Sequence, residues 1–232
     1  MKFSNETGYT IIETMLFLGI SGLLVTGILA GAGASINTQR YRDSVSSLQS
    51  VLQQQYSEVS NVSNDGTSGS CDSKPRGQSD CVILGRYITT IDGKNLLIQD
   101  VIGKTPSSSV SSLNDVEIFK ENGYTIQISS SGNTTYVIEW SSSLVNESNI
   151  PKLFSMLILR SPNSGIVRTF LANNPIVGIQ TLLTKEALLN TEVKMCVDSN
   201  GLFTGARMAV QVMKNIAGAS GIEVLEEAGS GC

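Results

Sequence analysis

Few residues of this 232-residue chain could carry out chemistry, and histidine is absent from it. Without histidine, a Ser-His-Asp triad, a Cys-His pair and an imidazole metal ligand are all excluded. Phosphate-binding glycine loops and nucleophile-elbow motifs are also missing, and Glu226-Glu227 lies in a tail of small and polar residues. The run Asp198-Ser199-Asn200-Gly201 could suggest a calcium loop but is more typical of a hairpin turn. We therefore expect no catalytic residue, no metal site, no cofactor and no enzymatic activity.

The four cysteines stand at positions 71, 81, 196 and 232 and form no C-x-x-C pair, which argues against a tetrahedral zinc site. An even number of cysteines in an exported chain favours two disulfides. Closeness in sequence favours Cys71 with Cys81, across a polar stretch that favours turns, and this leaves Cys196 with Cys232. Three pairings are open in principle, and so is a state with four reduced thiols.

Size and charge narrow the function classes further. With 41% hydrophobic residues, the chain can bury a substantial core, and one compact head domain over residues 63–232 is the default expectation. The formal net charge is -4, and no cluster of lysine and arginine is visible. Neutralising a nucleic-acid backbone takes such clusters, so nucleic acid is not an expected partner.

The most unusual charge of the chain is Glu13, which lies at the start of a long apolar segment near the N-terminus. Residues 14 to 39 contain no charged side chain, and the run 15–36 is long enough, as a helix, to cross a bilayer core of about 30 Å. Glu13 borders this run, between Ile12 and Thr14. Because a carboxylate is costly in lipid, we expect it to have a cationic partner. Gly27 and Gly31 have the spacing that lets two helices approach closely.

The residues around Glu13 also follow a known pattern. The run Gly8-Tyr9-Thr10-Ile11-Ile12-Glu13 resembles the prepilin peptidase site of type IV pilins and type II secretion pseudopilins, and the resemblance covers residues 2–35. It implies a leader at 1–8, cleavage after Gly8, N-methylation of Tyr9 and retention of the helix as a filament-forming segment. Glu13 falls where the family has its conserved glutamate. There it can pair with the new amine of Tyr9 in a neighbouring subunit.

This resemblance implies a structural role: a major or minor pilin-like subunit of a type IV pilus or a related filament. Its partners would be further copies of itself, related minor pilins, a prepilin peptidase and a membrane assembly platform. The subunit would cross the membrane once with its N-terminus inside, and would then join an extracellular filament at the cell surface. A pair of Cys196 with Cys232 would resemble the C-terminal disulfide loop of many pilins. The alternative is an ordinary signal peptide ending near Ala34, which would release a secreted β-rich binding domain.

The hydrophobic period predicts an α+β fold. A long helix over 9–62 is expected to span the membrane at 9–36 and to continue as an amphipathic helix at 37–62, with a break near Gly33 as the alternative. The period then changes from 3.6 to 2 and predicts a β-rich antiparallel head, whose many strands resemble the pseudopilin H group. A short helix is expected at 184–189. The expected strands are 82–84, 87–91, 96–102, 116–119, 124–128, 135–140, 154–160, 166–171, 193–197, 208–212 and 222–225.

Overall fold

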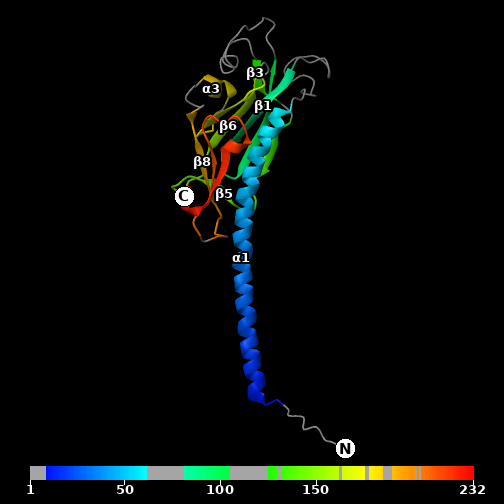
Figure 1. The fold of residues 1–232 in the computed structure, drawn as a ribbon, viewed down its shortest axis with the longest axis vertical. Helices are drawn as coiled ribbons and strands as arrows, with labels where there is room; N and C mark the ends of the chain where they lie inside the picture. The colour runs from blue at the N-terminus through cyan, green and yellow to red at the C-terminus, as the bar shows by residue number, and fades with distance from the viewer. Residues whose placement is uncertain are drawn as a thin grey trace, which may run out of the picture. The chain divides into compact units, whose positions relative to one another are not determined.

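The chain contains one long N-terminal helix followed by two antiparallel β-sheets, so it belongs to the α+β class (Figure 1). Two compact units can be distinguished, Met1–Arg40 and Tyr41–Cys232, and the boundary between them falls within helix α1 (Ile11–Ser60). The computed structural model describes residues 9–61, 81–104, 125–129, 132–161, 164–175, 178–184, 190–201, 203 and 205–232.

Helix α1 changes character at the boundary between the two units. Before Tyr41 the described side chains are exposed or half-buried, whereas from Tyr41 onward one face is buried at every third or fourth position. This is the spacing of an amphipathic helix. Leu48 and Leu52 are completely buried on that face, and each stabilises the fold by about 1.5–3 kcal/mol. The buried positions of α1 are Tyr41, Ser44, Val45, Leu48, Leu52, Gln55, Tyr56 and Val59.

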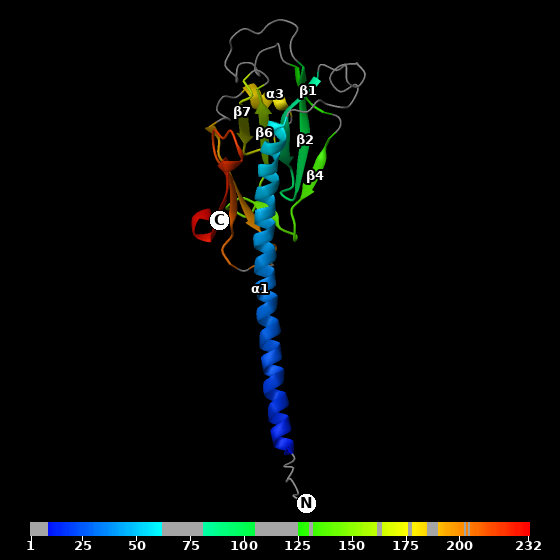
Figure 2. The same cartoon turned by 45° about the vertical axis from the view of Figure 1, so that its right-hand side comes forward.

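The larger sheet has six strands in the order β3-β2-β1-β6-β7, with β4 pairing beside β3 on β2 (Figure 2). Its middle strands are buried on both faces, which explains their nearly continuous apolar sequence. The order follows from consecutive hairpins, with β6 returning next to β1. The strands are β1 (Cys81–Thr90), β2 (Asn95–Lys104), β3 (Thr125–Ile128), β4 (Thr134–Val137), β6 (Phe154–Arg160) and β7 (Val167–Ala172).

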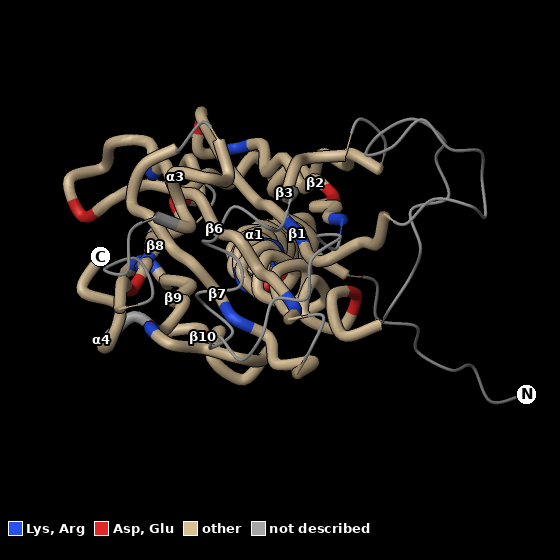
Figure 3. The backbone as a smooth tube through the Cα atoms, turned by 90° about the horizontal axis from the view of Figure 1, so that it is seen from above, with Lys and Arg blue, Asp and Glu red and all other residues tan. Residues whose placement is uncertain are grey.

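The smaller sheet has four strands in the order β10-β9-β8-β5. Side chains from both sheets and from the second half of α1 form one core, and Figure 3 shows α1 end-on among these strands. The side-chain amides of Gln49 and Gln53 donate to the carbonyl of Ile222 at 3.0 and 3.1 Å, which fixes the last strand to the helix. The strands are β5 (Ser143–Val145), β8 (Val193–Asp198), β9 (Ala209–Val212) and β10 (Ile222–Leu225).

A second apolar cluster covers the opposite face of the larger sheet. Leu157 and Leu159 of β6 belong to it, while their neighbours Met156 and Ile158 belong to the core beneath α1. Helix α3 (Ile179–Thr184) packs on this second face. The remaining short helical elements are η2 (Ala219–Gly221) and α4 (Glu227–Ser230).

Two glycines are required by their surroundings. A Cβ atom at Gly85 would lie 1.9 Å from the carbonyl oxygen of Ile158, and Gly85 follows a shift in the β1–β2 register. Gly93 has a φ of 73°, and a Cβ atom there would lie 2.6 Å from the carbonyl oxygen of Leu144. Any larger side chain at either position must displace backbone.

Most expected elements are present, with instructive differences. The strand over 154–160 and the buried face of α1 are confirmed, whereas the segments 82–84 and 87–91 form one strand that carries an irregularity at Gly85. The expected strand 135–140 ends at Val137, and β5, α3, α4 and η2 were not expected. The expected strand 116–119 and helix 184–189 lie outside the described residues, apart from Thr184, which ends α3.

Candidate functional site

The candidate site is the first turn of α1, where the apolar segment carries its single charge. The backbone N–H of Glu13 donates to Thr10 Oγ1 at 3.3 Å. Thr-x-x-Glu at a helix start is the capping-box arrangement, and a carboxylate there also interacts favourably with the helix dipole. The side chain of Thr10 thus caps the helix, and an acidic residue in the first turn favours helix formation through the dipole.

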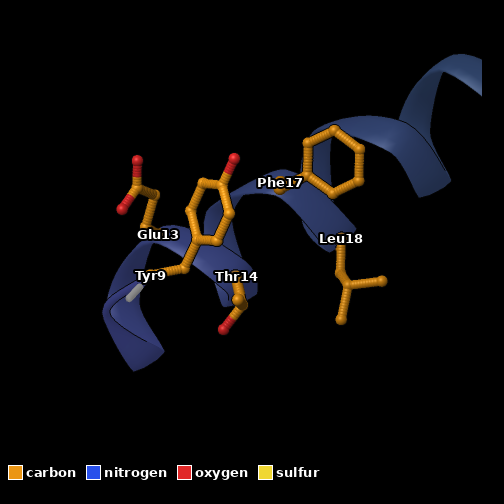
Figure 4. A pocket seen from close by; sticks show the side chains of 5 residues that line it. All are labelled: Tyr9, Glu13, Thr14, Phe17 and Leu18. Carbon is orange, nitrogen blue, oxygen red and sulfur yellow. The ribbon is translucent and has the colours of Figure 1, made fainter. Parts of the chain in front are cut away.

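The exposed side chain of Glu13 has apolar neighbours on the helix surface. A shallow hollow on the helix surface is lined by Tyr9, Glu13, Thr14, Phe17 and Leu18. Figure 4 shows the carboxylate and the rings of Tyr9 and Phe17 on one side of the helix, with Thr14 and Leu18 on the other. The sequence contains no lysine or arginine between Tyr9 and Gln39. A cationic partner for Glu13 must therefore come from outside this segment.

The threonines of the apolar segment satisfy their own hydrogen bonds. Thr14 Oγ1 donates to the carbonyl of Ile11 at 2.9 Å, and Thr26 Oγ1 donates to the carbonyl of Leu23 at 2.9 Å. Hydroxyl groups bonded to the preceding turn can be placed in an apolar medium at little cost. The charge of Glu13 is different, because no group of its own turn can neutralise it.

The apolar segment is exposed around its whole circumference. It is long and apolar enough to cross a membrane, judged by length and composition. A helix that is hydrophobic on all sides is stable only when lipid or protein surrounds it. The exposed large apolar residues of this segment are Tyr9, Ile11, Ile12, Met15, Leu16, Phe17, Leu18, Ile20, Leu23, Leu24, Val25, Ile28, Leu29 and Ile36.

The other expected site residues of this segment can be placed only in part. Tyr9 is 82% exposed directly before the helix, and Gly8 lies outside the described residues. Gly27 and Gly31 lie on exposed helix, and a Cβ atom at either would meet nothing within 4 Å. Both glycines are therefore available to an external helix.

The cysteines are oxidised where they are described. Cys196 and Cys232 form a disulfide with a Cα–Cα distance of 5.8 Å, which confirms that expected pairing. Cys81 is also disulfide-bonded, and Cys71, its expected partner, lies outside the described residues. Ser230 Oγ donates to the carbonyl of Arg207 at 2.7 Å, so the C-terminal tail is fixed beside β8 and β9 by a covalent bond and a hydrogen bond.

Charged groups of the head are paired with one another. Arg86 lies 2.8 Å from Glu58 and also pairs with Asp100, which ties α1 to β1 and β2. Lys194 pairs with Glu147 at 2.7 Å, in a polar pocket that also contains Lys152. Both signs of charge are interspersed along the described backbone (Figure 3). Within the described residues, no three His, Cys, Asp or Glu side chains gather as a metal ion would require.

Two structural features of functional interest were missed at the sequence level. Thr10 is the residue that caps α1, and the Thr-x-x-Glu spacing was a signal that could have identified it. Tyr41 opens the head unit: its hydroxyl donates to the carbonyl of Val197 at 2.8 Å and accepts from the N–H of Met208 at 2.7 Å. No local pattern indicates a contact with residues more than 150 positions away.

Comparison of the chain with family models, with curated proteins and with solved structures finds no match.

Proposed function

We propose that this chain is a structural subunit of a type IV pilus or a related pilin-like filament, cleaved after Gly8 and assembled through α1. One observation carries the proposal: a single carboxylate, Glu13, stands in the first turn of a membrane-length helix that is exposed on every side. A soluble globular domain has no use for such a helix. A subunit that passes from lipid into a protein filament needs one.

Cleavage would create the missing partner of Glu13. A new N-terminus at Tyr9 is a cation, and N-methylation leaves it charged. Within one chain this amine and the Glu13 carboxylate lie four residues apart, and in a staggered bundle the amine of one subunit can reach the carboxylate of the next. An unpaired carboxylate costs about 3 kcal/mol at the bilayer centre on insertion scales and less near the end of a span, where Glu13 stands. Assembly removes that cost by pairing the two charges, so Glu13 sets the register between subunits.

The surroundings of Glu13 explain why its pairing would be specific. Tyr9 and Phe17 place apolar atoms on the same side of the helix as the carboxylate, so a bound amine would be partly shielded from water. Attraction between opposite charges strengthens as the local dielectric constant falls. The exposed glycines, including Gly27 and Gly31, let a second helix approach closely above this point.

The test separates the charge of Glu13 from its capping role. Glutamine also serves at this position of a capping box, so Glu13→Gln keeps the helix start and removes only the charge. Thr10→Ala is the matched control, because it removes the cap and keeps the charge. Breaking a buried ion pair by removing one partner costs about 3–5 kcal/mol, so filament incorporation of Glu13→Gln should fall at least tenfold. Incorporation is measured in sheared filament fractions against total protein.

Mass spectrometry of the mature N-terminus supplies the second readout. A methylated Tyr9 in wild type and in both variants supports the proposal and shows that processing is intact. A mature chain that begins at Ser35 would identify a secreted domain released from a signal peptide and would refute the filament role. Filament incorporation of Glu13→Gln equal to that of wild type would refute the charge-pair mechanism.

A further inference from the structure

Three loops of the head meet around Gly93. The carbonyl of Gly93 accepts from the N–H of Leu144 at 2.6 Å, and the carbonyl of Lys94 accepts from the N–H of Ile138 at 3.1 Å. A Cβ atom at Gly93 would also lie 3.4 Å from Pro151. The β1–β2 turn at 91–94, the turn at 138–142 and the loop at 146–151 therefore form one continuous surface, which we call the three-loop surface.

Each of the three loops exposes a large apolar side chain. Ile91 is 75% exposed, Ile150 is 58% exposed and Trp140, the single tryptophan of the chain, is 45% exposed. Trp140 and Ser141 have φ values of 54° and 59°, a left-handed conformation that side chains other than glycine rarely adopt. Each such residue costs about 1–3 kcal/mol and persists where the surrounding contacts enforce it. The left-handed conformations of Trp140 and Ser141 thus lower the stability of the fold, and the surrounding contacts must offset this cost to hold the tryptophan turn at the surface.

The three-loop surface is linked to the residue at which the head begins. The side-chain amide of Asn200 donates to the carbonyl of Ser141, and Ser47 of α1 donates to Glu139 at 3.3 Å. Asn200 lies in the turn between Val197 and Phe203. The carbonyl of Val197 accepts from the hydroxyl of Tyr41, and the ring of Phe203 stacks on the ring of Tyr41. The tryptophan turn is therefore separated from Tyr41 by one layer of contacts.

The sequence places Tyr41 shortly after the apolar segment. Tyr41 follows Ile36, the last large apolar residue of that segment, by five positions. Five residues span about 7.5 Å as a helix and at most about 18 Å when fully extended. The headgroup layer on each side of a bilayer is about 5–7 Å thick. Residues 36–41 are helical, so Tyr41 lies close to the outer edge of the headgroup layer if residues 9–36 cross the membrane along the bilayer normal.

We propose that the three-loop surface rests on the lipid interface while the chain is in the membrane, with Trp140, Ile91 and Ile150 at the boundary between headgroups and acyl chains. Tryptophan prefers this boundary because its ring is apolar and its N–H needs a polar partner. Asp92 and Glu139 on the same loops limit insertion to the headgroup level. The inference rests on the membrane stage of the proposed function and not on filament formation.

The opposite end of the larger sheet offers an internal control. Thr90 pairs with Phe154 at the end that carries the three-loop surface, and Arg160 pairs with Val167 at the other end. Ile166, in the β6–β7 connection at that other end, is 43% exposed. Its exposure closely matches that of Trp140, and its position is a sheet length away.

The experiment uses intrinsic fluorescence of the full-length chain in phosphatidylcholine vesicles, with and without lipid brominated along the acyl chains. Because Trp140 is the single tryptophan, its emission reports on this surface alone. We expect a blue-shifted emission and a loss of fluorescence in brominated lipid. The double variant Trp140→Phe, Ile166→Trp should emit as in water and lose no fluorescence. Replacing Ile91 and Ile150 with serine should weaken the quenching of Trp140.

Each outcome decides the proposal. Insertion of the helix is measured separately by resistance to carbonate extraction. An inserted chain with unquenched Trp140 overturns the lipid contact and leaves the filament role intact. Equal quenching at positions 140 and 166 shows a head without a preferred lipid-facing end and also overturns it. A chain that is not inserted overturns both this inference and the membrane stage of the proposed function.

Discussion

Replacing Tyr41 with phenylalanine should destabilise the head more than its small chemical change suggests. The ring is 1% exposed and stacks on Phe203 with a centroid distance of 4.9 Å. Phenylalanine keeps this stacking. It removes the hydroxyl that accepts from the N–H of Met208 and donates to the carbonyl of Val197. The variant therefore isolates two hydrogen bonds to backbone.

The magnitude follows from what these two backbone groups lose. Leaving a buried donor or acceptor without its partner costs about 1–3 kcal/mol, so we expect a loss of about 2 kcal/mol, weighted toward the Met208 N–H. For a unit of this size, each kcal/mol lowers the unfolding temperature by about 2–4 °C. The Tyr41→Phe variant should therefore unfold about 4–8 °C below wild type.

Two other tyrosines provide graded controls. The hydroxyl of Tyr56 lies 2.8 Å from Thr169 Oγ1 in the core, and that of half-buried Tyr136 donates to Ser47 at 3.1 Å. Both partners are hydroxyl groups that can rotate toward other groups or water. Circular dichroism of the three phenylalanine variants in detergent should rank the losses as Tyr41, then Tyr56, then Tyr136. A Tyr41→Phe variant no less stable than Tyr136→Phe would refute this account of the junction.

Two further predictions concern the head. The Cys196–Cys232 disulfide closes a loop of 36 residues, so Cys196→Ala with Cys232→Ala should lose about 4 kcal/mol on the chain-entropy model; an unchanged melting temperature would refute this. The second prediction concerns Asp92. Desolvation raises the pKa of its carboxyl group, but hydrogen bonds from the backbone of Asn95 and Lys94 and from the side chains of Asn95 and Thr90 lower it by more. The pKa of Asp92 therefore lies below its usual range. The ionised carboxylate stabilises the fold at pH values above the pKa of Asp in the unfolded chain, about 3.9. This stabilisation is lost as the pH falls through the lower pKa that Asp92 has in the folded protein. The stability advantage of wild type over Asp92→Asn should therefore shrink as the pH falls below about 4, and a constant difference in chemical denaturation would contradict it.

The parts of the fold that follow local rules could be predicted from the sequence. The face of α1 from Tyr41 to Val59 follows a helical period because one core covers it. The apolar run 156–159, inside the strand 154–160, marks a strand buried on both faces. The first turn of α1 was identified by its lone charge in an apolar run. That turn is conspicuous in the sequence because its single charge is followed by a long run without any charged residue.

The remaining features depend on contacts between distant residues. The expected strand over 135–140 ends at Val137, and shortly after it Trp140 and Ser141 adopt left-handed conformations, with Asn200 of the turn after β8 donating to the carbonyl of Ser141. Similarly, β1 continues through Gly85 because the carbonyl of Ile158 leaves no room for a side chain there. The conformation at such positions is determined by residues that are close in space but distant in sequence, so local sequence patterns do not predict it.

The way α1 is held also determines when the head can fold. Its amphipathic half depends on residues made much later: Tyr41 binds a carbonyl 156 positions away, and Gln53 binds the last strand 169 positions away. Synthesis at about 5–20 residues per second separates these partners by roughly ten seconds or more. During synthesis, the apolar face in the second half of α1 must remain in an unfolded chain until β10 has been made. Premature collapse of this face is the folding hazard that such a long sequence separation creates.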